Sequence, residues 1–254
     1  MGMRTKISAG VCTAKGDFKN RNEDDFLLNT KTLKGEGNYN KKSIISKDFG
    51  IFAICDGMGG AKNGKEASSF VVSRLAEQRE YLQNRNSLEG INDVIRDLNN
   101  SLVKKYKSRA GTTLALVIIT KEKIYYANVG DSRIYFFINN KLYKVSEEHN
   151  QAREFEKDGF NVQGGKNILT QYIGIPEEEM VIEAHCGEWR HHGNEIITVL
   201  CSDGVTEGIS EEILEEMLNT NEKKSAVFLA DFIVNSAIKG KSKDNITSMV
   251  IKIK

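Results

Sequence analysis

The chain of 254 residues is poor in proline and has no long apolar run and no low-complexity tract. Its single proline is Pro176, and no repeat or Gly-rich or Pro-rich stretch marks a linker, so we expect one domain over residues 1–254. No segment reaches the roughly 20 apolar residues that a membrane-spanning helix needs. The first residues match neither a signal peptide nor a myristoylation site. We therefore expect a cytoplasmic protein that does not bind membranes.

The sequence also lacks an excess of charge of either sign. Lys and Arg number 36 against 35 Asp and Glu, which gives a net charge of +1. Nucleic acids attract proteins through an excess of positive charge, so this balance gives no case for a nucleic-acid partner. With 39% hydrophobic residues the chain can bury a sizeable core, and we expect a globular monomer.

Cysteine and histidine are scarce, which argues against disulfides and zinc. The cysteines are widely separated and never form a Cys-x-x-Cys pair, so we expect all of them to be reduced; they are Cys12, Cys55, Cys186 and Cys201. The histidines are His149, His185, His191 and His192. Cys186 and His191 supply only two of the four ligands of a structural zinc site, and we expect them at the surface. No Gly-x-Ser-x-Gly motif supports a serine nucleophile.

What the sequence does contain is an acid placed directly after an apolar segment. Residues 51–55 are five apolar residues that suit a strand buried on both faces, and Asp56 and the glycine-rich residues 57–60 follow. An unpaired carboxylate buried beside such a strand would cost several kcal/mol, so Asp56 either faces solvent or is neutralised by a cation. Taken alone, the segment is equally typical of an ordinary Asp-Gly turn.

The same arrangement recurs along the chain. Asp131 follows apolar residues 124–129, Asp203 follows residues 195–201, and Asp244 precedes residues 246–253. Glu23 belongs to a run of three acids that, by itself, is typical of a solvated surface loop. Carboxylates gathered at one rim raise one another's pKa, and divalent cations would relieve this. Oxygen ligands alone favour magnesium, manganese or calcium over zinc, and no EF-hand loop is present.

The order of the expected elements favours an α+β fold. Strands come in runs separated by pairs of helices, which predicts two antiparallel sheets packed face to face, each covered by a helix pair. The expected strands are 6–14, 51–55, 111–119, 124–129, 134–138, 142–145, 195–201 and 246–253. The expected helices are 65–81, one capped by Ser87, 146–159, one capped by Ser210, and 225–239. We expect a hairpin connection at 35–47 and a mobile flap at 146–174. Acids at strand ends would then meet at one rim of the sandwich.

Six sequence blocks resemble, in order and over residues 8–253, the type 2C family of metal-dependent serine/threonine protein phosphatases. The blocks are Asn22-Glu23-Asp24, Asp56-Gly57-Met58-Gly59-Gly60, Gly111-Thr112-Thr113, Asn128-Val129-Gly130-Asp131-Ser132-Arg133, Ser202-Asp203-Gly204-Val205-Thr206-Glu207 and Asp244-Asn245-Ile246-Thr247. Met58 and residues 166–170 are similar to the bacterial branch. The resemblance implies a four-layer α/β/β/α sandwich formed by a single catalytic domain over 1–254.

The resemblance also implies a set of site residues. Those of the core metal site, which would hold two manganese or magnesium ions, are Asp56 as the bridging ligand, the Gly57 carbonyl, Asp203, Asp244, and Glu23 through a bound water. Those of a weaker third site are Asp131, Asp203 and Glu207. Lys19 stands where relatives carry an arginine that grips the substrate phosphate, and Arg21 is the alternative. The implied catalytic residues are thus Asp56, Lys19 and Glu23.

The implied activity is the hydrolysis of phosphoserine and phosphothreonine in proteins by a metal-activated water, which would reverse the action of a serine/threonine kinase. The alternative is a catalytically weak family member that binds phosphoproteins as a regulator. The retained acids favour the enzyme, because a binding module would not need every metal ligand.

Overall fold

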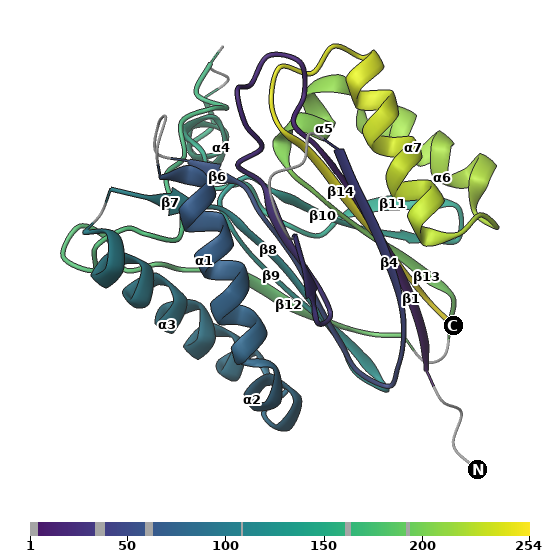
Figure 1. The fold of residues 1–254 in the computed structure, drawn as a ribbon, viewed down its shortest axis with the longest axis horizontal. Helices are drawn as coiled ribbons and strands as arrows, with labels where there is room; N and C mark the ends of the chain where they lie inside the picture. Colours follow the sequence, from purple (N-terminus) through teal and green to yellow (C-terminus); the bar gives the residue numbers. More distant parts are fainter. Residues whose placement is uncertain (1–4, 34–38, 59–62, 108, 161–163, 192–193) are drawn as a thin grey trace.

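The computed structural model describes residues 5–33, 39–58, 63–107, 109–160, 164–191 and 194–254. Two six-stranded antiparallel sheets pack face to face, with helices on both outer sides (Figure 1). This is the predicted α+β sandwich of four layers. Among the helices of these ranges, none combines the length and the apolar character needed to cross a membrane.

The first sheet has β1 and β14 near its middle, and these two strands carry most of its pairing. Its strands, in spatial order, are β11 (Lys141–Lys144), β10 (Arg133–Ile138), β13 (Ile196–Cys201), β14 (Ile246–Ile253), β1 (Lys6–Ala14) and β4 (Tyr39–Lys47). β1 lies antiparallel to both β14 and β4. The sheet therefore joins the two ends of the chain.

The second sheet is built mainly from the middle of the chain. Its strands, in spatial order, are β12 (His185–Arg190), β9 (Lys123–Val129), β8 (Leu114–Ile119), β5 (Gly50–Cys55), β2 (Asp25–Leu28) and β3 (Lys31–Thr32). A short ribbon of β6 (Gly57–Met58) and β7 (Gly111–Thr112) extends the β5 and β8 pair beyond the sheet. This ribbon begins one residue after Asp56, at the rim of the sandwich.

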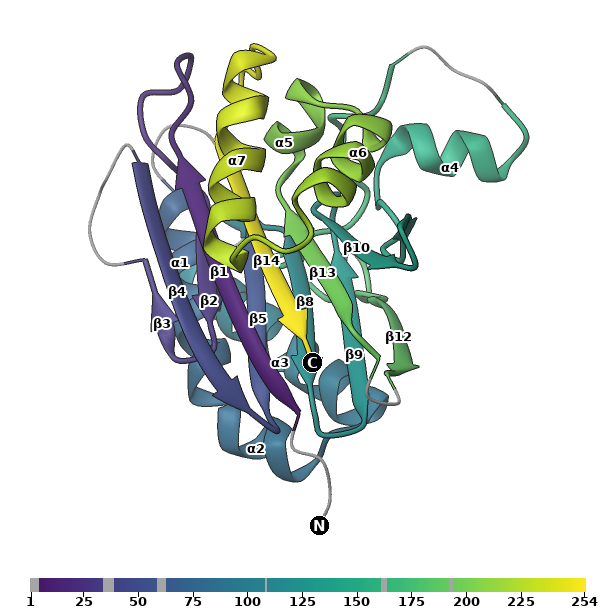
Figure 2. The same cartoon turned by 90° about the vertical axis from the view of Figure 1, so that its right-hand side faces the viewer.

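The helices form the two outer layers. Those over the second sheet are α1 (Gly64–Glu77), α2 (Arg79–Asn84) and α3 (Leu88–Tyr106), and those over the first are α6 (Glu211–Asn221) and α7 (Ala226–Lys239). The predicted caps Ser87 and Ser210, and Ser225 before α7, accept hydrogen bonds from the backbone N–H groups three residues on. Two short helices, α4 (Gln151–Lys157) and α5 (Asp203–Gly208), lie at the rim, where α4 stands apart from the sheets (Figure 2).

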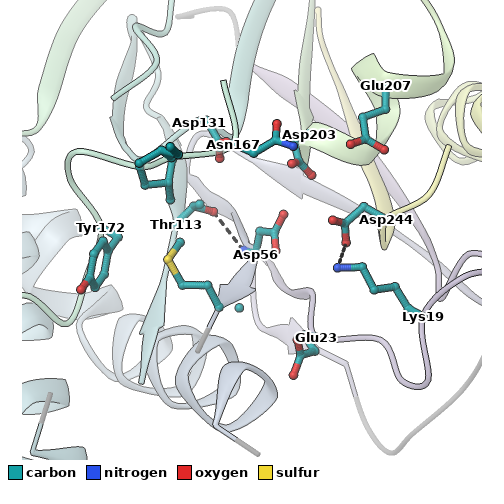
Figure 3. A pocket seen from close by; sticks show the side chains of 14 residues that line it. Lys19, Glu23, Asp56, Thr113, Asp131, Asn167, Tyr172, Asp203, Glu207 and Asp244 are labelled. Atoms are coloured by element: carbon teal, nitrogen blue, oxygen red, sulfur yellow. Dashed lines mark hydrogen bonds and ion pairs between the residues drawn. The ribbon is translucent and has the colours of Figure 1, made fainter. Parts of the chain in front are cut away.

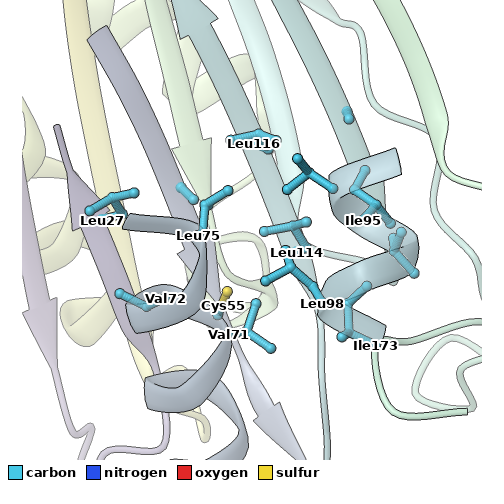
Figure 4. Close-up of a cluster of buried hydrophobic side chains, with 14 of the residues drawn as sticks. Leu27, Cys55, Val71, Val72, Leu75, Ile95, Leu98, Leu114, Leu116 and Ile173 are labelled. Carbon is cyan, nitrogen blue, oxygen red and sulfur yellow. The ribbon is translucent and has the colours of Figure 1, made fainter. Parts of the chain in front are cut away.

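Strand β5 shows how alternation builds the apolar layers. Phe52 and Ile54 pack between the two sheets, whereas Ile51, Ala53 and Cys55 pack against the helices α1 and α3. All five side chains are fully buried, as expected for a strand covered on both faces. Figure 4 shows the helix side of this arrangement, where residues of α1 and α3 meet the second sheet. Asp56 follows directly, so its carboxylate lies just beyond the apolar core.

The prediction of a hairpin connection at 35–47 is wrong for residues 39–47, which form the edge strand β4; residues 35–38 lie outside the described ranges. β4 pairs with β1 along its whole length, from Lys6 opposite Lys47 to Ala14 opposite Tyr39. Its side chains alternate between exposed and half-buried because it is an edge strand. Its residues are therefore largely polar, and the sequence did not predict a strand there.

Three other expectations change in detail. The helix expected at 146–159 begins at Gln151, capped by Asn150, because the Ser146 hydroxyl instead accepts a hydrogen bond from the Ile134 N–H at 2.9 Å. The helix expected at 65–81 is divided between α1 and α2, and the strand expected at 111–119 is divided between β7 and β8. The strands β2, β3, β6 and β12 were not predicted.

The surface placement expected for His191 is also wrong. This side chain is 2% exposed, whereas Cys186 is half-buried, and His192 lies outside the described ranges. All four cysteines are free thiols, in agreement with the sequence.

Candidate metal centre

The backbone around Asp56 is fixed by the two threonines of the Gly-Thr-Thr block. The Asp56 N–H donates to Thr113 Oγ1 at 3.0 Å, and the Asp56 carbonyl accepts from Thr112 Oγ1 at 2.8 Å and from the Thr113 N–H at 2.9 Å. Both threonines are fully buried. Since the main-chain groups of Asp56 are satisfied in this way, its carboxylate is left free to face the rim.

The eight residues implied as metal ligands or catalytic residues all line one hollow of about 570 Å³ at this rim, whereas the alternative Arg21 does not (Figure 3). They are Lys19, Glu23, Asp56, Gly57, Asp131, Asp203, Glu207 and Asp244. The carboxylates come from the loop before β2, the ends of β5 and β9, the two ends of α5, and the segment before β14. The rest of the lining includes the apolar side chains of Met58, Ile168 and Leu169 and the aromatic ring of Tyr172.

The hollow brings several carboxylates close together, and each raises the pKa of its neighbours. Burial, reinforced by the neighbouring carboxylates, raises the pKa of Asp56 well above its ordinary value. The same causes raise the pKa of Asp203 to about 6 and that of Asp131 to about 7. Asp203 Oδ1 is buried and has no hydrogen-bond partner among the residues that the structure describes. These carboxylates lie deep in the fold yet open onto the hollow, a donor set of hard oxygens that fits divalent magnesium or manganese.

The carboxylates surround the hollow without yet forming a closed coordination shell. Within the described ranges, no three His, Cys, Asp or Glu side chains converge closely enough to hold an ion as they stand. Asp244 Oδ1 instead lies 2.6 Å from Lys19 Nζ, and the Asp244 side chain is partly exposed. Closing a shell around an ion therefore requires side-chain rotation. For Asp244 this rotation breaks its contacts with Lys19 Nζ and the Asn245 N–H, and for Glu207 it breaks the hydrogen bond from the Lys243 N–H.

Lys19 and Arg21 occupy different positions. Lys19 lines the hollow; burial lowers the pKa of its ammonium, but Asp244, Asp56 and Asp203 raise it by more, so that it stays charged. Arg21 does not line the hollow, and its guanidinium pairs with Glu23 at 3.2 Å and with Glu66 at 2.7 Å. The geometry thus favours Lys19 over Arg21 as the cation that faces the hollow.

Asn245 fixes the loop that carries Lys19 and Glu23. Its side-chain oxygen accepts from the Glu23 N–H at 2.8 Å, and its side-chain nitrogen donates to the carbonyls of Lys15 at 2.7 Å and Arg21 at 3.0 Å. Asn245 is 1% exposed. The loop before β2 is therefore anchored to the start of β14, beside Asp244.

The interpretation of Glu23-Asp24-Asp25 as a solvated loop is wrong for its last two members, which are buried. Asp24 accepts hydrogen bonds from Ser202 Oγ at 2.9 Å and Thr247 Oγ1 at 2.6 Å, and burial raises its pKa to about 7. Asp24 thus ties the loop before β2 to the residue before Asp203 and to β14. The hydroxyl groups in the two later blocks were the only sequence signal of this network.

His149 was also missed by the sequence reasoning. Its ring Nδ1 accepts a hydrogen bond from the Gly130 N–H at 3.1 Å, and the backbone N–H of His149 donates to the Gly130 carbonyl at 3.0 Å. Burial lowers the pKa of His149 to about 4, so the imidazole is neutral at pH 7 and can accept this bond. Gly130 has φ +95°, a backbone conformation that favours glycine. The two hydrogen bonds between His149 and Gly130 hold the turn that carries Asp131.

Comparison with known proteins provides an independent line of evidence. The sequence profile of the family described as protein phosphatase 2C matches residues 14–173. The serine/threonine phosphatase stp of Listeria welshimeri is 29% identical over 218 residues, which cover 80% of this chain and 84% of that protein.

Solved structures give the same fold. The serine/threonine phosphatase of S. agalactiae superposes with a TM-score of 0.79 at 22% identity, over 96% of this chain and 98% of that one. The catalytic domain of the serine threonine protein phosphatase PstP, solved in complex with 2 manganese ions, gives a TM-score of 0.78 at 19% identity, over 98% and 99%. At these identities the likeness establishes the fold alone.

Proposed function

This chain belongs to the protein phosphatase 2C family, and we propose that the acidic hollow is its catalytic centre. The protein is a metal-dependent serine/threonine phosphatase, a hydrolase that removes phosphate from phosphoserine and phosphothreonine in proteins. The observation that carries the site assignment is that the eight residues implied as metal ligands or catalytic residues all line one hollow. The catalytic domain would extend over residues 1–254.

The core of the hollow would hold two manganese or magnesium ions. Their ligands would be Asp56 as the bridging carboxylate, the Gly57 carbonyl, Asp203, Asp244, and Glu23 through water. A third ion would use Asp131, Asp203 and Glu207. When bound, such ions would supply a water of lowered pKa as the nucleophile and would offset charge on the phosphoryl oxygens. The 2 manganese ions of PstP and the raised pKa values of Asp203 and Asp131 support this proposal.

The side chains of this protein would hold the reacting groups in place. Lys19 would donate charge-assisted hydrogen bonds to the oxygens of a substrate phosphate, and the position of its ammonium at the hollow, beside Asp244, supports this role. Thr112 and Thr113 fix the backbone of Asp56 and so orient its carboxylate. Met58 and Tyr172 would shield the reacting phosphate from bulk water.

The partners follow from the activity. The substrates are phosphorylated proteins, and the partner enzyme would be a serine/threonine kinase whose action this phosphatase reverses in bacterial signalling. We place the protein in the cytoplasm as a monomer that binds neither nucleic acid nor membranes. The net charge of +1 supports the absence of a nucleic-acid partner.

The test is hydrolysis of p-nitrophenyl phosphate and of a phosphothreonine peptide by protein stripped of metal and then given Mn²⁺ or Mg²⁺. We expect no turnover after chelation and recovery with Mn²⁺. Turnover that survives exhaustive chelation would overturn the metal-dependent site. Tight binding of the phosphopeptide without turnover, at any metal concentration, would instead support the alternative of a catalytically weak family member that binds phosphoproteins as a regulator.

A further inference from the structure

A second hollow of about 420 Å³ adjoins the first. The two hollows share Asp131, Asn167, Asp203 and Glu207 in their walls, so that a chain bound in one can continue into the other. One side of the second hollow is formed by β10, β11 and the start of α6, and the other by α4 and residues 166–167. Figure 2 shows α4 and α6 on the two sides of this part of the rim.

Three of the four cations in the second hollow are already matched by acids of the same hollow. Glu148 lies 2.5 Å from Arg133 Nε and 3.1 Å from Lys144 Nζ. Glu211 lies within 4.0 Å of both of these cations, and Arg153 pairs with Glu156 at 3.1 Å. Internal ion pairs therefore satisfy most of the charge on these walls.

Lys166 is the exception. Its side chain lines the second hollow and is exposed, and among the described residues it forms no ion pair or hydrogen bond. Its neighbour Asn167 lines both hollows. Six acids line the second hollow together with these four cations. Asp131, Asp203 and Glu207 are shared with the first hollow, where they are the proposed ligands of a third ion. Glu148, Glu156 and Glu211 pair with the other three cations, so that among the described residues Lys166 is the one of the four that has no paired acid.

We propose that the second hollow binds an anionic side chain of the substrate polypeptide, a short distance along the chain from the phosphorylated residue, with Lys166 as the cation that selects it. This deepens the proposed function, because it names a class of substrate for the same site. A phosphopeptide with a flanking acidic residue would pair with Lys166, whereas one with a flanking basic residue would place like charges together. The subsite is exposed, so its effect is that of a solvated ion pair.

The test is a set of phosphothreonine peptides that carry Glu, Gln or Lys at each position within four residues of the phosphothreonine. At one or more positions we expect kcat/KM to be about threefold higher for Glu than for Gln, and lower for Lys, the size typical of an exposed ion pair. Lys166→Met, which keeps the apolar stem and removes the charge, should abolish the preference, and Lys166→Glu should reverse it. Lys104→Ala, which removes an exposed lysine of α3, should leave the preference intact.

Two readouts separate this inference from the proposed function. Turnover of p-nitrophenyl phosphate, which occupies only the first hollow, should be equal in Lys166→Met and the wild type. Anisotropy of labelled Glu and Gln peptides bound to Asp56→Asn in Mn²⁺ reports the subsite without turnover, and the Glu peptide should bind about threefold more tightly. If the Glu and Gln peptides are equivalent at every position in both measurements, or if the preference survives Lys166→Met, the inference is wrong, even where Mn²⁺-dependent turnover stands.

Discussion

The apolar layers of the sandwich and the acidic rim are made by the same strands, yet they obey opposite energetics. Phe52 and Asp56 are four residues apart on and just after β5: the first is fully buried between the sheets, and the second faces the hollow. Burial of Phe52 stabilises the fold, whereas crowding Asp56 with other carboxylates raises its pKa and opposes folding of the charged form. The stabilising core and the proposed catalytic centre are therefore only four residues apart along the chain. The effects of a mutation on stability and on turnover should show which of the two regions it changes.

The largest expected effect comes from the rim. Asp56→Asn removes the proposed bridging charge, so turnover in Mn²⁺ should fall at least about a thousandfold, as when a principal electrostatic element of an active site is lost. The metal-free protein should be as stable as the wild type or more so, because a buried charge is removed. Steady-state kinetics and thermal unfolding in chelator check the two halves. Asp203→Asn should behave alike, and near-normal rates in both variants would defeat the site assignment.

Phe52→Ala should show the reverse pattern. Truncating this buried ring leaves a cavity between the sheets and should lower the free energy of unfolding by about 3–5 kcal/mol. The protein that remains folded should keep its Mn²⁺-dependent specific activity, because Asp56 is held by Thr112 and Thr113 outside this layer. Denaturant unfolding and activity per folded molecule provide the measurement. A large loss of specific activity without a loss of stability would mean that core and rim are not separable.

The next effect is a dependence of stability on pH. The pKa values of Asp203 and Asp131 are raised from 3.8 to about 6 and about 7, so their favourable contribution is complete below pH 4 and is lost as pH rises through 6 and 7. Without metal, the melting temperature should therefore be lower by several degrees at pH 8 than at pH 5 on account of these groups.

One buried group opposes this trend, and a matched variant separates it. Burial lowers the pKa of His149 to about 4, so its contribution is lost as pH falls below its ordinary value of 6.5. Thermal unfolding of Asp203→Asn, which keeps His149, isolates the carboxylate effect: its melting temperature should fall less over the same range. If the melting temperature changes equally with pH in Asp203→Asn and in the wild type, ionisation of the rim carboxylate Asp203 does not destabilise the fold.

The same contrast decides how far the sequence could be interpreted. The buried strands were predictable because burial on both faces demands continuous apolar runs, as in residues 51–55 and 196–201. The edge strand β4 was not, since its polar side chains carry no such run. Asp56 could be placed at the rim from its position after β5.

The partners of Asp24 and His149 could not be predicted, because the bonds join segments up to 223 residues apart that only the packed sandwich brings together. The motif marks which residues matter at the rim. It does not reveal which hydrogen bonds hold them there.

The smallest expected effect distinguishes two cations of the loop before β2. Lys19 Nζ lies 2.6 Å from Asp244 Oδ1 and opens onto the hollow, whereas Arg21 does not line the hollow and pairs with Glu23 and Glu66. A guanidinium can donate two parallel hydrogen bonds to a phosphate, whereas an ammonium is a compact and more strongly hydrated charge. Lys19→Arg should therefore lower the KM for a phosphothreonine peptide by about fivefold, the effect of roughly 1 kcal/mol from one additional bond.

Lys19→Ala should raise KM by more than fivefold and change kcat less, because the carboxylates that would hold the metals remain. Arg21→Ala is the matched control from the same loop: it removes a cation that does not line the hollow, so KM should change little. Steady-state kinetics of the three variants on one peptide decide between the two residues. An unchanged KM in Lys19→Ala together with a large rise in Arg21→Ala would assign the phosphate contact to Arg21. The loop would then have to rearrange when substrate binds, because the guanidinium of Arg21 is paired with two carboxylates in this structure.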